Sequence, residues 1–409
     1  QSGGNFNVVV GDEAGTAITT GDNNVGLGYA ALTATTTGTG NTGIGYAALD
    51  ANTTANDNTG VGANSLGVNT TGTRNTSVGS DSLDANTEGN DNTAVGKNSL
   101  SANTTAGSGT AVGKGALQTN TTGGDNTAVG RSALELNTTG ANCTAVGRDA
   151  LKANTTASNN TAVGDRCLDV NTTGAENTGV GKGALGSNTT GANNTVMGKN
   201  AGTAVTTGAT NTLIGSVCHD NLTEGSLNTA LGYNLAPSAV DVDSEIVIGS
   251  SITGAGTNTV RIGTGGGTAT PSLDGSDTSW AAASDLRLKK DVANSTVGLS
   301  FLNDLRPVTF KWQHKNEVAQ DLPQYDVNSS APIFGEGKAH HGFIAQEVKA
   351  VIDNHSDVLD GNNIWHEDPD GTQQLSQGNL VPMLVKAVQE LSAKIEVLES
   401  QPRCKCKGE

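Results

Sequence analysis

The stretch NTAVGKNSLSANTTAGS, residues 92–108, is followed directly by a second version of itself, GTAVGKGALQTNTTGGD, residues 109–125. The second copy begins 17 residues after the first, and the two align without a gap. In both, an apolar residue precedes a glycine, and a leucine follows five residues after the apolar one. The pattern continues outward in both directions, so the shortest description of the first 250 residues is one repeated unit.

Two apolar columns keep this register. One column is Val10, Leu27, Ile44, Val61, Val78, Val95, Val112, Val129, Val146, Val163, Val180, Met197, Ile214, Leu231 and Ile248. The other is Leu32, Leu49, Leu66, Leu83, Leu100, Leu117, Leu134, Leu151, Leu168 and Leu185. A strict period is typical of stacked coils. We expect the two columns to form continuous internal ladders in a β-solenoid of fifteen coils, about 70 Å long at an inter-strand spacing of roughly 4.8 Å.

The polar positions fit the same prediction. Asparagine recurs three residues before the valine column, as at Asn41 and Asn58, and eight residues after it, as at Asn52 and Asn69. Stacked amides can hydrogen-bond from coil to coil. A glycine follows every member of the valine column, which indicates a positive φ or a close backbone approach where the coil turns.

Composition alone would suggest a flexible linker, because 56 of 409 residues are glycine and only 3% are aromatic. Flexible linkers, however, have no reason to keep apolar residues in register. One valine and one leucine per coil make a thin core, so we expect several chains to associate.

Charge and cysteine content exclude several functions. The net charge of -17 leaves no concentrated basic face, so we expect no nucleic-acid partner. No apolar run reaches the roughly 20 residues of a membrane helix. The chain starts at Gln1 without a signal peptide, and we expect an upstream piece. Five cysteines without paired spacing predict no disulfide framework and no metal site, and nothing in the sequence indicates a cofactor.

The repeat decays after Cys218, and composition changes at Ser284, beyond which most aromatic residues lie. We predict a repeat shaft over 1–235, a neck over 236–283 and a second, small α/β domain over 284–409. Its last part carries an apolar seam with heptad spacing, which predicts a short coiled-coil helix with Pro382 in its first turn. The seam is formed by Leu384, Val388, Leu391, Ile395 and Leu398.

Four motifs resemble one family. They are SDLRLKKDV at 284–292, LNDLRPVTFKW at 302–312, HGFIAQEV at 341–348 and LVPMLVKAVQEL at 380–391. Together they are similar to the intramolecular chaperone domain of endosialidase-type phage tail spikes and fibres. The resemblance implies a domain that trimerises, guides folding of the β-structured stem and then cuts itself off. The repeats themselves resemble the shafts of phage tail fibres and the heads of trimeric adhesins, and an intertwined triple β-helix stays open beside the solenoid.

The resemblance also implies site residues. The scissile bond would be Ala283–Ser284, with Ser284 as nucleophile and Lys289 as general base; Lys290 competes but has the wrong spacing for the family. A lysine can act as a base only where desolvation lowers its pKa, which trimer assembly would achieve. Asp285 and Arg287 would shape the loop or pair charges. His341 could orient the site or be structural.

We therefore expect a homotrimeric viral tail or surface fibre, outside the cell, whose shaft is a spacer or attaches to a host glycan or protein receptor. A bacterial surface adhesin with the same module is the close alternative. A polysaccharide-degrading tail spike is a weaker one, because the acidic residues scatter over different coil positions. Columns of threonine also run beside the valine column, so an ice-binding solenoid is a third alternative.

Overall fold

The computed structural model describes residues 4–265, 267–270, 281–282, 290–320, 325–333, 338–358, 364–367 and 371–401. The chain divides into two compact units, residues 1–284 and 285–409.

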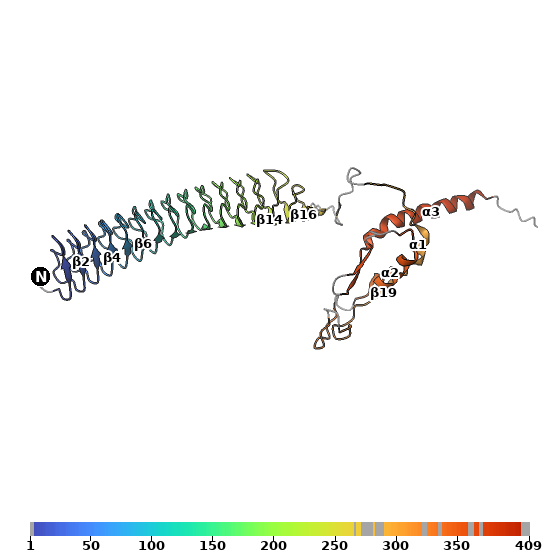
Figure 1. The fold of residues 1–409 in the computed structure, drawn as a ribbon, viewed down its shortest axis with the longest axis horizontal. Helices are drawn as coiled ribbons and strands as arrows, with labels where there is room; N and C mark the ends of the chain where they lie inside the picture. Colours follow the sequence, from blue (N-terminus) through green and yellow to red (C-terminus); the bar gives the residue numbers. More distant parts are fainter. Residues whose placement is uncertain are drawn as a thin grey trace, which may run out of the picture. The chain divides into compact units, whose positions relative to one another are not determined.

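The first unit is a β-solenoid in which each coil contributes one short strand (Figure 1). Neighbouring strands pair in parallel, with residues 17 positions apart opposite each other, such as Thr110 and Thr127. Each coil pairs with the next coil of the same chain. This is the predicted solenoid and not the intertwined triple β-helix. The strands are β1(Val8–Val10), β2(Val25–Leu27), β3(Thr42–Ile44), β4(Thr59–Val61), β5(Thr76–Val78), β6(Thr93–Val95), β7(Thr110–Val112), β8(Thr127–Val129), β9(Thr144–Val146), β10(Thr161–Val163), β11(Thr178–Val180), β12(Thr195–Met197), β13(Thr212–Ile214), β14(Thr229–Tyr233) and β15(Ile246–Ser250).

The solenoid ends in a different arrangement. Strand β16(Val260–Thr264) still pairs in parallel with β15, but after a coil shortened to 14 residues, because Ile246 lies opposite Val260. Two antiparallel strands follow, β17(Gly267–Thr270) on β16 and β18(Ala281–Ala282) on β17. Parallel stacking therefore continues to Thr264, and a change of strand direction closes the unit.

The leucine column lies inside the solenoid, as predicted, with leucines such as Leu117 fully buried. The prediction for the valine column was wrong. Val112 points outward and is 37% exposed, and its equivalents are half-buried or exposed, while the preceding residue, here Ala111, is fully buried. Successive strand residues face opposite sides, and next to a column leucine the inner side has little room: a Cβ added at Gly43 would lie 3.2 Å from Cγ of Leu32. A larger inner residue, the fully buried Leu213, lies next to Gly202, where the leucine column holds a glycine.

The glycine after each valine is where the coil turns. These glycines have φ between +131° and +144°, a region closed to residues with a Cβ. The carbonyl oxygen of the next coil is also close: a Cβ on Gly113 would lie 2.4 Å from the oxygen of Gly130. Both predicted reasons for glycine are thus present together.

The sequence did not indicate that the buried leucines are left-handed. All ten, from Leu32 to Leu185, have φ between +50° and +59°. This conformation costs a residue with a Cβ roughly 1–2 kcal/mol. Burial of a leucine side chain returns about 1.5–3 kcal/mol, so the side chain holds the backbone in an unfavourable turn.

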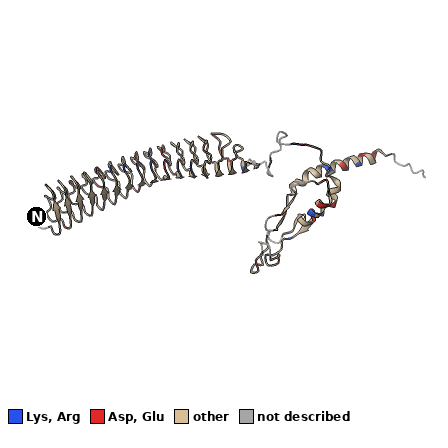
Figure 2. Cartoon of the chain, viewed as in Figure 1, with Lys and Arg blue, Asp and Glu red and all other residues tan. Residues whose placement is uncertain are grey.

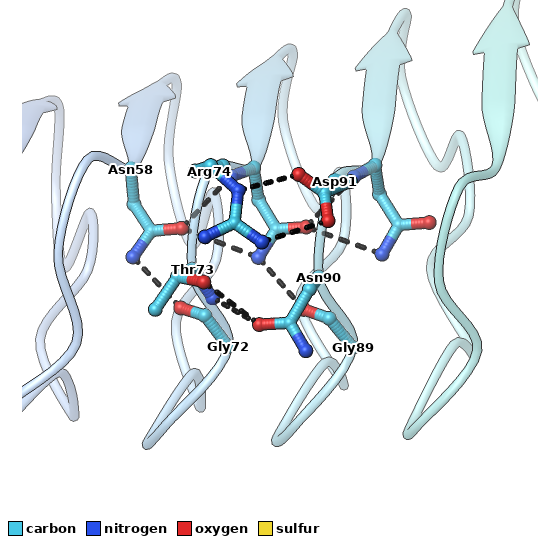
Figure 3. A network of polar contacts seen from close by, with 9 residues as sticks. Asn58, Gly72, Thr73, Arg74, Gly89, Asn90 and Asp91 are labelled. Carbon is cyan, nitrogen blue, oxygen red and sulfur yellow. Dashed lines mark hydrogen bonds and ion pairs between the residues drawn. The ribbon is translucent and has the colours of Figure 1, made fainter.

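Buried asparagines satisfy the backbone at the corners of the coil. The side-chain amide of Asn58 donates to the carbonyl of Gly72 at 2.8 Å, and its oxygen accepts the N–H of Asn75 at 3.0 Å (Figure 3). In the second column, the Asn86 amide donates to the Asn69 oxygen at 2.8 Å. A buried amide without partners would cost about 1–3 kcal/mol. The predicted coil-to-coil amide bonds are confirmed.

The second unit is a small α/β domain. Its elements are α1(Leu299–Asp304), β19(Val308–Phe310), β20(His340–Gly342), α2(Ala345–Asn354), β21(Trp365–Glu367), β22(Gln373–Leu375), a short 3₁₀ helix over Gln377–Leu380 and α3(Val381–Ser400). Strands β19 and β20 pair antiparallel, as do β21 and β22. The core consists of Val297, Phe301, Leu305, Val348, Ile352, Ile364 and Leu380. Pro382 lies in the first turn of α3, as predicted. No helix among the described residues has both the length and the apolarity of a membrane span.

Candidate functional site

The proposed scissile bond, Ala283–Ser284, comes one residue after the end of β18 in the sequence. Ala281 pairs with Thr270 and Ala282 with Ala269, so the chain is held in the terminal sheet of the shaft up to Ala282. Ala283, Ser284, Asp285, Arg287 and Lys289 lie outside the described residues, so the predicted nucleophile and base stay predictions. The boundary between the two compact units falls between residues 284 and 285, one bond beyond the proposed cut.

Lys290, the competing base, is described. Its side chain is 91% exposed, and its ammonium group lies 4.0 Å from a carboxylate oxygen of Asp291. The described part of the chain therefore does not enclose the Lys290 side chain.

His341 lies in β20, opposite Thr309 of β19. The Nδ1 atom of His341 is 3.5 Å from the Thr309 hydroxyl, at the outer limit of a hydrogen bond. Both residues line a pocket of about 310 Å³, together with Pro307, Val308, Gly342, Phe343 and Gln377. The pocket combines an imidazole, a hydroxyl and an amide on an apolar wall.

The neighbouring His340 was missed by the sequence analysis. Its ring stacks on Phe310, with the centroids 5.7 Å apart, and its buried Nε2 has no hydrogen-bond partner among the described residues. A buried nitrogen without a partner is costly. Two adjacent histidines in the sequence could have indicated that His340 also deserved attention. The sequence alone does not show which of the two rings faces the pocket, because successive residues of a strand point to opposite sides.

Two of the quoted motifs meet through an ion pair. The guanidinium of Arg306, from LNDLRPVTFKW, binds the carboxylate of Glu347, from HGFIAQEV, with Nε 2.9 Å from Oε2. The hydrogen bond from Arg306 lowers the pKa of Glu347. The pair joins the segment before β19 to α2, so these motif residues have a structural role.

A second link joins α3 to α1. Oε2 of Glu390 accepts the backbone N–H of Leu299 at 2.9 Å, and this bond is the main reason that the pKa of Glu390 is lowered. Lys386, one turn earlier, lies 3.6 Å from the same carboxylate. The terminal helix is thereby fixed to the first helix of the domain.

Two apolar surfaces remain uncovered within the chain. On α3 the predicted seam is exposed, from 44% at Leu391 to 66% at Leu398. On the shaft, the outward valine column runs along one face of the parallel sheet, with a column of threonines two residues earlier on strands β3 to β14. Exposed apolar stripes of this length mark interaction surfaces.

Comparison with known proteins agrees with this architecture. Residues 284–357 match the family model described as chaperone of endosialidase. Comparison with curated proteins and with solved structures found no match. The chain thus combines a repeat β-solenoid shaft with a following segment that is similar to the chaperone of endosialidase.

Proposed function

We propose that this chain is a homotrimeric fibre subunit of a virion tail, whose C-terminal unit drives trimerisation and folding of the shaft and then cuts the Ala283–Ser284 bond. The main support for the proposal is that two independent boundaries fall at almost the same place in the chain. The family match begins at residue 284, and the compact units divide between residues 284 and 285. A cut there would release the second unit and leave the whole described shaft intact.

The proposed cleavage requires only residues of the chain and one water molecule. Neutral Lys289 accepts the hydroxyl proton of Ser284, whose oxygen attacks the carbonyl carbon of Ala283. The peptide C–N bond breaks as the protonated lysine returns a proton to the nitrogen, leaving an ester. Water hydrolyses the ester, which gives a carboxylate at Ala283 and a free amine at Ser284.

Timing would follow from solvation. A lysine in water is protonated and inert, whereas exclusion of water lowers its pKa towards the working range. Packing of three subunits around residue 289 would exclude that water. Cleavage would then follow correct assembly and occur once per chain.

The trimer is supported by the two uncovered apolar surfaces. Roughly one third of the surface of an outward valine is still exposed, and burying that part would contribute about 0.5–1 kcal/mol. The outward column has fifteen members, so the sum is on the order of 10 kcal/mol per chain. The exposed α3 seam would form a coiled coil at the other end of the chain.

The cleavage step is tested by denaturing electrophoresis with intact-mass analysis. The wild-type chain and the Lys290→Ala control should give a fragment beginning at Ser284, whereas Ser284→Ala and Lys289→Ala should stay whole. A fragment beginning elsewhere, or normal cleavage in Lys289→Ala, would refute the dyad.

A bacterial adhesin with the same module would share the shaft and the cleavage but not the genetic setting. Structural phage genes around the coding sequence would support the fibre, and an outer-membrane anchor would support the adhesin. An ice-binding role would use the outward threonine face, so it requires that face to remain free. Thermal hysteresis by the assembled protein would favour that role over a face buried between subunits.

A further inference from the structure

Basic residues of the shaft gather in one column. Residues 1–258 contain nine lysines and arginines and twenty acidic residues. Six of the nine basic residues stand two positions after the valine column, against only Asp12 and Asp165 among the acidic ones. The six are Lys97, Lys114, Arg131, Arg148, Lys182 and Lys199. Figure 2 colours the lysine and arginine positions blue on the cartoon of the chain.

This column stacks like charges on successive coils. Lys97, Lys114, Arg131 and Arg148 follow one another without interruption, at a backbone spacing of about 4.8 Å that is shorter than the Debye length of about 8 Å at physiological salt. Their charges therefore repel one another in the isolated shaft. Folding alone gives no reason to collect them in one line.

Another column of the same shaft avoids this arrangement. Asp57, Arg74 and Asp91 alternate in sign on successive coils, and Nε of Arg74 lies 2.6 Å from Oδ1 of Asp91 (Figure 3). Opposite charges on adjacent coils stabilise each other modestly. The contrast indicates that the basic column is kept for a ligand and not for the fold.

The basic side chains are accessible. All six belong to exposed residues. Arg131 and Arg148 share the Asp149 carboxylate, at 3.3 and 3.7 Å, and Arg148 also reaches Asp165 at 2.7 Å. Among the described residues the four lysines form no ion pair. Their ammonium groups remain available for anions from outside the chain.

We propose that this basic column binds a linear anionic polysaccharide lying along the shaft. The partner must be extended, because the cations lie in a line, and it must carry repeated carboxylate or sulfate groups to match them. That the polymer is a cell-surface glycan rests on the proposed function, since only an extracellular fibre meets one.

A nucleic acid fits the column less well. Proteins hold single strands in basic grooves with aromatic rings on which successive bases stack. Here the column continues into Tyr29 and Tyr46 only beyond two uncharged positions, and those rings stack on each other at 5.4 Å.

The test is calorimetric titration of the full chain with heparin, a linear sulfated polysaccharide, with neutral dextran and a single-stranded oligonucleotide as comparisons. The column variant is Lys114→Gln, Arg131→Gln, Arg148→Gln. The matched control is Arg74→Gln, Lys152→Gln, Arg166→Gln, which removes the same residue types outside the column. The column variant should bind heparin about tenfold more weakly, as expected for three exposed charge contacts, and the control within about twofold of wild type.

A loss of binding could also result from misfolding, so a second variant is designed to increase binding. Asp165→Lys joins the two basic runs into seven consecutive coils and should bind heparin more tightly than wild type. Equal losses in both triple variants, tighter binding of the oligonucleotide than of heparin, or unchanged binding in Asp165→Lys would each overturn the proposal. Cleavage is scored separately on a gel, so failure of binding and failure of the proposed function are distinguishable.

Discussion

The carboxylate of Glu390 on α3 accepts a hydrogen bond from the backbone N–H of Leu299, 2.9 Å away at the start of α1. Ninety-one positions separate these residues in the chain. The bond satisfies one of the N–H groups that a helix start leaves unpaired. It also ties the helix proposed to form the coiled coil to the segment that follows the proposed cut.

Loss of this bond should loosen the second unit. Glu390→Gln removes the charge that favours the bond and should lower the thermal midpoint of the unit, followed by tryptophan fluorescence. Glu396→Gln, an exposed position on the same helix, is the control and should leave the midpoint unchanged. Equal midpoints for both variants would show that the Glu390 bond contributes nothing to stability.

Leucines in the left-handed conformation predict an unusual substitution result. Leu117→Ala should destabilise the shaft by about 3 kcal/mol, the cost of a cavity at a buried leucine. Leu117→Gly should cost no more than Leu117→Ala, because glycine adopts φ near +52° without strain. Gly15 and Gly202 already occupy this column. Urea unfolding of both variants checks the order, and a glycine variant clearly weaker than the alanine one would contradict it.

The turning glycines should tolerate no side chain. Gly113→Ala places a Cβ at a φ of +136°, 2.4 Å from a backbone oxygen, and should cost at least about 2–3 kcal/mol. Gly124→Ala is the matched control, because the nearest atom to its Cβ would be 3.5 Å away. The measurement is the urea midpoint of each variant, and similar midpoints would show that the coil can relax around Gly113.

His219 predicts acid sensitivity at the end of the shaft. It occupies the leucine column, is fully buried, and neither ring nitrogen has a hydrogen-bond partner among the described residues. Burial lowers its pKa from 6.5 to about 4, against the opposing influence of Glu245. Between these values the unfolded chain binds a proton that the folded chain does not, so stability falls as the pH drops from 6.5 towards 4.

The loss at the lower end of this range should be roughly 3 kcal/mol. His219→Leu restores the residue type of the column and should remove this part of the pH dependence. Unfolding midpoints at several pH values in that window give the comparison. A pH profile that is the same in wild type and His219→Leu would mean that another group is responsible.

The outward valines predict where subunits meet. If the proposed trimer forms through this face, Val95→Asp, Val112→Asp, Val129→Asp should leave single coils folded but shift the particle to monomer, because charges would be buried between subunits. Thr105→Asp, Thr122→Asp, Thr139→Asp is the control, since the same column naturally holds Glu88 and Glu224. Light scattering gives the mass. A valine variant that stays as oligomeric as the control would exclude this face as the interface.

The repeat itself determined most of the shaft. The period, the buried leucines, the asparagine bonds and the turning glycines all follow from residues repeated at fixed intervals, because each repetition places the same side chain in the same environment. The motifs from Ser284 onward indicated the second unit in a similar way, and three of the four lie within the segment that matches the chaperone of endosialidase. For the candidate site, these motifs predicted which residues take part, but they did not predict how the side chains are arranged in space.

Tertiary structure decided which way the side chains face. The sequence shows that Val112 and Leu117 recur, yet only the path of the coil shows that Ala111 fills the interior while Val112 faces outward. The same holds for His340 and His341, and for the ion pair that joins Arg306 to Glu347. Periodicity records how often an environment recurs, whereas inside and outside depend on strand alternation and on the narrow space between opposite walls of one coil.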